Sequence, residues 1–174
     1  PLVIGTTGLD EKTMDAVKEH SKKIPILQSY NMSVGINLLF DFVYHAASTL
    51  KETDYDIEIS ESHHKHKIDA PSGTAITLGE KAAKGRKVDF NNAKELDRIN
   101  LSSARKRGTI GFAVTRGGEI AGEHTVSFIG KDDRIDLVHK ANNRSIFVKG
   151  AIKAAIFLSK QKKGLYSMKD VVED

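Results

Sequence analysis

A run of imidazole and ammonium side chains is the part of this sequence best equipped for chemistry. Three histidines and two lysines fall within five residues, from His63 to Lys67. Because like charges this close repel one another, some of these imidazoles are expected to be neutral near pH 7. A neutral histidine can accept a proton, and a lysine can donate one or hold an anion. His63 and Lys67 would share a face if this stretch formed a helical turn.

The next residues add a way to bind an anion. Pro71 to Thr74 read as the start of a helix, with Ser72 and Gly73 at its first turn. Backbone N–H groups at a helix N-terminus bind carboxylates or phosphates, and glycine lets them approach closely. A basic loop that leads into such a helix favours a substrate with carboxylates. A solvated basic loop before an ordinary serine-capped helix is the alternative interpretation.

The histidines also permit a metal-site interpretation. His63, His64, His66 and Asp69 are all possible ligands. The neighbouring lysines oppose a dication, and the chain has neither cysteine nor an H-E-x-x-H motif. We therefore expect no metal.

Composition limits the classes of partner. No apolar run approaches the roughly 20 residues that span a bilayer, so no membrane partner is expected. The net charge is +4, but the basic residues are dispersed and tryptophan is absent, which makes nucleic acid a minor alternative. The absence of cysteine fits a reducing cytoplasm, the location we expect.

The first third of the chain predicts part of a nucleotide-binding fold. A strand at Leu2–Ile4, a helix after Asp10 and a strand at residues 24–27 give the rhythm of a parallel α/β sheet. Pro25 favours the edge or the start of its strand. One βαβ unit takes about 30 residues, so residues 1–32 are expected to be a remnant of a Rossmann domain. The chain begins without methionine, as if inside a strand, which indicates that residues upstream are missing.

Two loops of this remnant could touch a dinucleotide. Gly5-Thr6-Thr7-Gly8 follows the first strand, where it is either a cofactor loop or a tight turn. No G-x-G-x-x-G loop accompanies it, so the pyrophosphate cradle is not present. Asn31, after the second strand, is a hinge, a ligand contact or simply a turn residue.

Residues 33–150 are expected to form the substrate-binding, catalytic and oligomerisation domain. A long helix after Ser33 is predicted by a stripe that comprises Leu38, Leu39, Phe42, Val43, Ala46, Ala47 and Leu50. A strand follows at residues 56–62, and a helix at residues 71–84. Residues 85–103 read as a surface excursion.

Three further strands complete the expected sheet. They lie near residues 110–114, 120–128 and 135–139, with a Gly-Gly hairpin predicted at residues 116–119. Together with residues 56–62 they predict a mostly antiparallel four-stranded sheet, on which a helix at residues 143–160 packs. Residues 151–174 are expected to return toward the nucleotide-binding domain. The fold class is thus α/β with an α+β C-terminal domain.

The segment from Glu61 to Ala75 reads E-S-H-H-K-H-K-I-D-A-P-S-G-T-A. It closely resembles the E-x-H-H-x-x-K-x-D-A-P-S-G-T-A signature of dihydrodipicolinate reductases. Agreement continues in order over nearly the whole chain, at Val3–Gly8, Asn31–Gly35, Arg116–Gly118, Gly122–His124, the Arg144 region and Gly164–Tyr166.

The resemblance implies an oxidoreductase of diaminopimelate and lysine biosynthesis. Such an enzyme reduces 4-hydroxy-tetrahydrodipicolinate, through dehydrated dihydrodipicolinate, with hydride from NADH or NADPH. The resemblance also implies a homotetramer built through the C-terminal sheet, whose exposed face we expect to carry alternating Ile, Phe and Val.

The resemblance assigns roles residue by residue. His63 matches the catalytic histidine and Lys67 the general acid, while His64, Gly73 and Thr74 match groups that hold the substrate carboxylates. The cofactor site is matched by Gly5, Thr6, Thr7, Ser29, Tyr30, Asn31 and Met32. Arg144 could reach a carboxylate or the cofactor, and otherwise is a surface residue.

The chain departs from the family at its start, where the glycine-rich loop and most of the Rossmann sheet are absent. Alone, it is therefore expected to bind NADH poorly and to turn over slowly. A non-catalytic dicarboxylate-binding or assembly module is the main alternative, followed by a basic nucleic-acid or metal-binding domain. The choice between NADH and NADPH, and between His63 and Lys67 as proton donor, stays open.

Overall fold

The computed structural model describes all residues from 1 to 174, and they form two compact units. One unit joins Pro1–Leu38 with Asn143–Asp174, and the other comprises Leu39–Asn142. The domain boundaries that we expected lay at residues 32/33 and 150/151. None of the helices combines the length and the apolar composition that crossing a membrane requires.

A three-stranded parallel sheet in the order β1-β2-β8 organises the first unit. Its strands are β1 (Leu2–Ile4), β2 (Pro25–Gln28) and β8 (Gly164–Tyr166). Helix α1 (Glu11–Ser21) joins β1 to β2, and Oδ1 of Asp10 accepts the Thr13 N–H at 2.8 Å to cap it. The predicted strand–helix–strand unit is confirmed.

Strand β2 is central rather than at an edge, because β8 pairs on its other side. Pro25 is the first residue of the strand, which was one of the two positions predicted for it, and its missing N–H is tolerated there. Strand β8 was not predicted. Its three residues are too few to show an alternating pattern.

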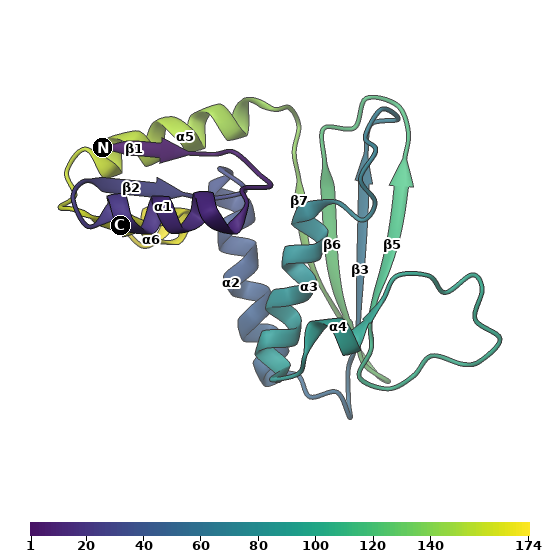
Figure 1. Cartoon of the computed structure of the whole chain (residues 1–174). Coiled ribbons are helices and arrows are strands. Elements are labelled where there is room, and N and C mark those ends of the chain that lie inside the picture. The colour runs from purple at the N-terminus through teal and green to yellow at the C-terminus, as the bar shows by residue number, and fades with distance from the viewer. The chain divides into compact units, whose positions relative to one another are not determined.

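The late helix forms as predicted but packs on a different sheet. Helix α5 (Ser145–Leu158) lies along β1 and β2, not on the larger sheet of the other unit (Figure 1). With the short helix α6 (Met168–Glu173) it encloses a core of Leu27, Met32, Ala154, Leu158 and Met168. The apolar stripe of α5 predicts that one face of the helix is buried, but it does not identify the sheet that covers that face.

The second unit contains a mixed five-stranded sheet, which corrects the expected four-stranded, mostly antiparallel one. The order is β4-β5-β3-β6-β7, and the strands are β3 (Asp56–His63), β4 (Lys94–Glu95), β5 (Ile110–Arg116), β6 (Glu123–Ile129) and β7 (Arg134–Lys140). Pairs β4–β5 and β3–β5 are parallel, and pairs β3–β6 and β6–β7 are antiparallel.

The predicted Gly-Gly hairpin between β5 and β6 is wrong, because β3 lies between these two strands. Residues 117–122 therefore cross over the end of β3 instead of making a tight turn. Strands β6 and β7 do form a hairpin, and Gly130 N–H donates to the Asp133 carbonyl at 2.9 Å across it.

Three helices complete this part of the chain: α2 (Val34–Thr49), α3 (Gly73–Arg86) and α4 (Phe90–Ala93). The buried residues of α2 are Ile36, Leu39, Phe40, Val43 and Ala47. Leu38 and Phe42 of the predicted stripe are exposed, so the stripe is displaced around the helix. The expected surface excursion is partly structured, because α3, α4 and β4 extend through Glu95.

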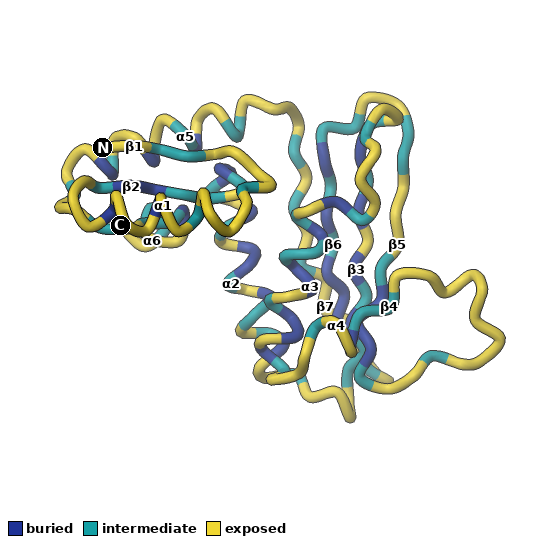
Figure 2. Tube along the Cα trace, in the orientation of Figure 1, coloured by how far each residue is buried: buried dark blue, intermediate teal, exposed yellow.

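The apolar face of the larger sheet is buried at its centre, whereas Val114 and Ile135 on the same face are each 40% exposed. Ile57, Ile59, Ile110, Val126 and Phe128 are each almost fully buried, and α3 contacts β3 and β5 (Figure 2). The expectation that alternating Ile, Phe and Val form the exposed face is therefore wrong. That face instead carries small and polar residues such as Ser60 and Ala113.

Candidate active site

Strand β3 delivers two ionisable side chains to the buried face of the sheet. Ile57, Ile59, Glu61 and His63 alternate along β3, and all four are buried. The first two belong to the apolar core, whereas Glu61 and His63 lie at the end of the strand. Pairing register places Glu61 opposite His124 of β6 and His63 beside Arg116 of β5.

The carboxylate of Glu61 is the hub of a buried polar cluster. Arg116 binds it with both terminal nitrogens, Nη2 to Oε1 at 2.8 Å and Nη1 to Oε2 at 2.9 Å. Ser72 N–H donates to Oε1 at 3.0 Å, and Nδ1 of His63 lies 2.5 Å from Oε2. Burial by itself would raise the pKa of Glu61, but these donors outweigh it and lower the pKa. Glu61 is therefore an ionised acceptor.

His63 is held as a neutral imidazole. Its pKa is lowered mainly by burial, with Lys67 and Arg116 adding to the decrease and Glu61 opposing it. Burial thus contributes more than the crowding of charges that the sequence suggested. Since Glu61 can only accept, Nδ1 carries the proton and Nε2 is the bare nitrogen. A Cβ on Gly122, whose φ is +147°, would lie 3.0 Å from Nε2, so glycine makes room for the ring.

His124 joins the cluster from β6. Its ring lies edge-on to that of His63 at a centroid distance of 5.1 Å, and its Nε2 is 3.1 Å from Oγ of Ser72. Burial lowers the pKa of His124 to about 4, so it is neutral at physiological pH. The same Ser72 Oγ accepts the Ala75 N–H at 3.2 Å and caps α3. His124 and Ser72 therefore tie the start of α3 to the sheet.

Lys67 lies on the loop between β3 and α3, and Nζ binds Asp69 at 2.7 and 2.9 Å. This pair lowers the pKa of Asp69, with smaller contributions from backbone N–H groups that include that of Gly73. Arg116 donates to the carbonyls of Asp69 at 2.6 Å and Lys67 at 3.3 Å, so one guanidinium holds both the buried carboxylate and the loop.

Residues 64–67 form a turn and not a helix, so the condition under which His63 and Lys67 would share a helical face is not met. The turn is closed by Lys67 N–H to the His64 carbonyl at 3.1 Å, and His64 N–H donates to the Ile120 carbonyl at 2.8 Å. His64 and His66 lie side by side, with ring centroids 6.3 Å apart. No group of three or more His, Asp or Glu side chains is arranged to bind a metal ion.

The first turn of α3 is open to an approaching anion. Gly73 is exposed, and a Cβ built on it meets nothing within 4 Å. Thr74 follows and is half-buried. The predicted residues His63, His64, Lys67, Gly73 and Thr74 all lie on the connection from β3 to α3, within one unit.

The predicted cofactor residues lie on two neighbouring loops of the other unit. Gly5, Thr6 and Thr7 follow β1 and are exposed, and residues 29–32 follow β2. Since β1 and β2 are adjacent and parallel, both loops leave the same edge, and Ser29 N–H donates to the Ile4 carbonyl at 3.1 Å.

Two further residues of this prediction have local contacts. Oδ1 of Asn31 accepts the Ser33 N–H at 2.9 Å, which is the geometry of a turn. Arg144 precedes α5, and its guanidinium carbon lies 6.0 Å from the ring centroid of Phe147.

Four members of the buried cluster were not predicted as site residues: Glu61, Ser72, Arg116 and His124. The alternation along β3 could have identified Glu61, because it places this residue on the same buried face as Ile57 and Ile59. An ionisable residue at a core position requires partners. A cation and further hydrogen-bond donors could therefore have been expected around Glu61.

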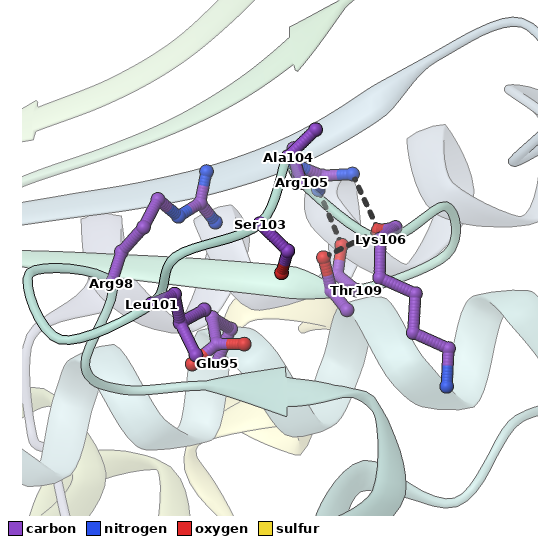
Figure 3. Close-up of a pocket in the computed structure, with 8 residues that line it drawn as sticks. All are labelled: Glu95, Arg98, Leu101, Ser103, Ala104, Arg105, Lys106 and Thr109. Atoms are coloured by element: carbon purple, nitrogen blue, oxygen red, sulfur yellow. Dashed lines mark hydrogen bonds between the residues drawn. The ribbon is translucent and has the colours of Figure 1, made fainter.

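A pocket of about 170 Å³ lies beside the segment after β4, away from these residues, and is a poorer candidate (Figure 3). Its lining residues are Glu95, Arg98, Leu101, Ser103, Ala104, Arg105, Lys106 and Thr109. Arg105 binds Asp56 at 2.6 Å, Glu58 at 2.8 Å and the Thr109 carbonyl at 2.5 Å. This guanidinium anchors the segment to β3 and is fully engaged there.

The chain is similar to known proteins over nearly its whole length. Residues 35–172 match the family model "Dihydrodipicolinate reductase, C-terminus", and residues 1–32 match "Dihydrodipicolinate reductase, N-terminus". The chain is 50% identical over 170 residues to the 4-hydroxy-tetrahydrodipicolinate reductase of Agrobacterium fabrum, covering 98% of this chain and 62% of that protein. It is 46% identical over 172 residues to that of Zymomonas mobilis, covering 99% and 67%.

A solved structure, "Dipicolinate bound Dihydrodipicolinate reductase from Paenisporosarcina sp. TG-14", is similar with a TM-score of 0.73 and 25% identity. The match covers 95% of this chain and 62% of that one. The chain thus spans roughly three-fifths to two-thirds of the length of these relatives. Its two family-model matches and these identities together show that the chain belongs to the dihydrodipicolinate reductase family.

Proposed function

We propose that this chain carries the substrate-binding and catalytic part of an NAD(P)H-dependent 4-hydroxy-tetrahydrodipicolinate reductase of diaminopimelate and lysine biosynthesis. The observation that carries the proposal is the concentration of His63, Lys67 and the open first turn of α3 on one connection. Relatives that are 46% and 50% identical to this chain bear this name, and a similar solved structure is described as dipicolinate-bound.

The β3–α3 connection suits a small dicarboxylate. One carboxylate would meet the ammonium of Lys67, and another the N–H groups at the start of α3, beside Gly73 and Thr74. Asp69 already shows part of this chemistry, because its carboxylate binds Nζ of Lys67 and the backbone N–H of Gly73 contributes to lowering its pKa. A substrate carboxylate would compete with Asp69 for these donors. His64 is assigned to the same carboxylates by its place in the family signature.

Reduction of the conjugated imine requires a hydride and a proton. The nicotinamide cofactor supplies the hydride when bound. Lys67 carries protons as an ammonium, whereas neutral His63 offers a bare Nε2 and must first take up a proton before it can donate one. This arrangement favours Lys67 as the proton donor and His63 as the group that relays or replaces the proton.

The loops after β1 and β2 fit part of a nicotinamide dinucleotide site. Gly5, Thr6 and Thr7 are exposed at the carboxyl edge of the parallel sheet, next to Ser29, Tyr30, Asn31 and Met32. Gly5 lies against Met32, where a Cβ would come within 3.3 Å of Cε, so the loops are packed together. We assign both loops, and Arg144, to the cofactor, which is NADH or NADPH.

The family resemblance also leads us to propose a homotetramer formed through the larger sheet, acting in the cytoplasm. The small and polar residues on the outer face of that sheet, among them Ser60 and Ala113, would let a second sheet approach closely. Light scattering of the purified protein checks the oligomeric state. A monomer at micromolar concentration would contradict this part of the proposal.

Turnover tests the reductase assignment. The chain would be extended with the part of the Agrobacterium fabrum relative outside the 170 matched residues, and substrate-dependent NAD(P)H oxidation would be followed at 340 nm. We expect turnover that His63→Gln lowers by about 100-fold or more. A His45→Gln variant, changed on the exposed side of α2, serves as the matched control. Absence of turnover, or equal turnover in both variants, would refute the assignment.

A further inference from the structure

The buried end of β3 carries more hydrogen-bonded polar side chains than a catalytic histidine and lysine alone would need. Glu61 is 2% exposed, yet it makes four hydrogen bonds, to Arg116 twice, to Ser72 and to His63. A buried ionised carboxylate destabilises the fold unless it is fully paired. An apolar residue at this position would need no such partners. Its only contact with a proposed catalytic group is the one to His63.

We propose that Glu61 is a positioning residue for His63, fixed in place by Arg116 and Ser72, whose carboxylate holds the Nδ1 proton and leaves Nε2 for proton transfer. The inference rests on the proposed function only in calling His63 catalytic. The orientation of the ring follows from the contacts alone.

The anchor explains why the carboxylate can act in this way. Arg116 binds both oxygens in a fork, which fixes the plane of the carboxylate and leaves Oε2 directed at Nδ1. The Ser72 N–H takes the remaining position on Oε1. Since a neutral imidazole has one donor and one acceptor nitrogen, holding Nδ1–H determines that Nε2 is the acceptor.

Arg116 also limits how much charge Glu61 confers on His63. The charged or titratable groups around His63 are Glu61 on the same strand, Lys67 on the loop, Arg116 at the end of β5 and His124 on β6. A carboxylate alone would favour the imidazolium, but burial outweighs it, and the charges of Lys67 and Arg116 add to the decrease in the pKa of His63. Glu61 therefore orients His63 without keeping it charged.

The test is ¹⁵N NMR of the histidine side chains of the whole chain, titrated over pH, with His63 assigned through a His63→Gln variant. In the unaltered protein above the pKa of His63, we expect Nδ1–H to be preferred by about tenfold or more, because a hydrogen bond to a charged group has that strength. Histidine in water favours Nε2–H. A wild-type His63 with the proton on Nε2 would overturn the inference without any variant.

The isosteric Glu61→Gln variant tests the cause. An amide has one acceptor oxygen in place of two, so it cannot serve Arg116, Ser72 and His63 together. We expect the tautomer to change toward Nε2–H and the pKa of His63 to fall further, because the one group that raised it is gone. A merely loosened structure would move that pKa the other way, toward its ordinary value. No change in tautomer would also overturn the inference.

A matched control lies on the same strand. Glu58 pairs with Arg105 at 2.8 Å and Arg98 at 3.1 Å, but it has no contact with His63. Glu58→Gln should leave the tautomer and pKa of His63 unchanged, and an equal response would count against a specific role for Glu61. These measurements need neither substrate nor cofactor, so failure of the reductase proposal would leave this result standing, and the reverse.

Discussion

The Arg116→Met variant gives the most informative stability prediction. Arg116 makes two hydrogen bonds to the Glu61 carboxylate, whose side chain is 1% exposed. Methionine keeps much of the apolar stem but leaves this carboxylate without its cation. Removing one partner of a buried ion pair costs about 3–5 kcal/mol. Because Ser72 and His63 still donate to Glu61, we expect the lower end, about 3 kcal/mol.

The pH dependence of this loss has a definite sign. In the wild type the pKa of Glu61 is lowered, so its contribution is complete above the unfolded value near 4.5 and is lost as pH falls through the folded pKa. Without Arg116, burial dominates and the pKa should rise above that value. The variant then gains relative stability as pH falls, and its deficit should be smaller at pH 5 than at pH 7.

Urea denaturation at the two pH values, followed by the NMR signals of Ile57 and Ile59, measures the free energy of unfolding where the cluster lies. Arg134→Met is the control, because its pair with Asp136 is exposed and is expected to contribute less than about 1 kcal/mol. A loss in Arg116→Met no larger than in this control would refute the reasoning. So would an equal deficit at both pH values.

Three further predictions concern packing and titration. Gly150→Ala would place a Cβ 1.7 Å from the Met32 carbonyl oxygen, so we expect about 2 kcal/mol or more of destabilisation by urea denaturation, and an unchanged midpoint would contradict that packing. In the wild type, the free energy of unfolding should fall as pH falls from 6.5 to about 4, because His124 takes up a proton in the unfolded chain but not in the folded one. His124→Gln should make this fall shallower, and an unaltered pH profile would argue against a buried neutral His124. Ser72→Ala should cost about 1 kcal/mol through loss of the α3 cap, more than Thr77→Ala in the same helix, and the reverse order would contradict the capping role.

The helices and strands of this fold could be predicted where neighbouring residues favour them. Asp10 and Ser72 belong to residue types that cap helices, and the side chain of each accepts a backbone N–H from the helix that follows it. The alternating residues of β3 and β6 predicted strands for the same reason. Such signals involve residues only a few positions apart, which is the range over which a pattern has meaning.

The order of the strands could not be predicted in the same way. Alternation is identical for a strand paired on either side and in either direction, so nothing in β5 or β6 showed that β3 would separate them. The Gly-Gly pair at residues 117–118 favoured a hairpin, but Gly117 N–H instead donates to the His63 carbonyl at 3.0 Å. Those glycines cross the end of β3.

The candidate site was predictable where its residues are close in sequence. His63, Lys67 and Gly73 lie within one connection, so their residue types and spacing were enough to predict a site there. Arg116 and His124 come from 53 and 61 residues further along than His63 by their numbering, and only strand pairing brings them to it. Residues such as these, which position others, have no local signal of their own.

The central claim is that the β3–α3 connection binds a dicarboxylate through Lys67. Calorimetric titration with pyridine-2,6-dicarboxylate tests it most directly, with Lys67→Met beside the control Lys65→Met, whose wild-type side chain is exposed two residues away. We predict saturable binding that Lys67→Met weakens by about 10- to 100-fold, the value of one hydrogen bond between charged groups, and that Lys65→Met leaves nearly unchanged. Equal affinity in all three proteins, or no binding to any of them, would contradict the account.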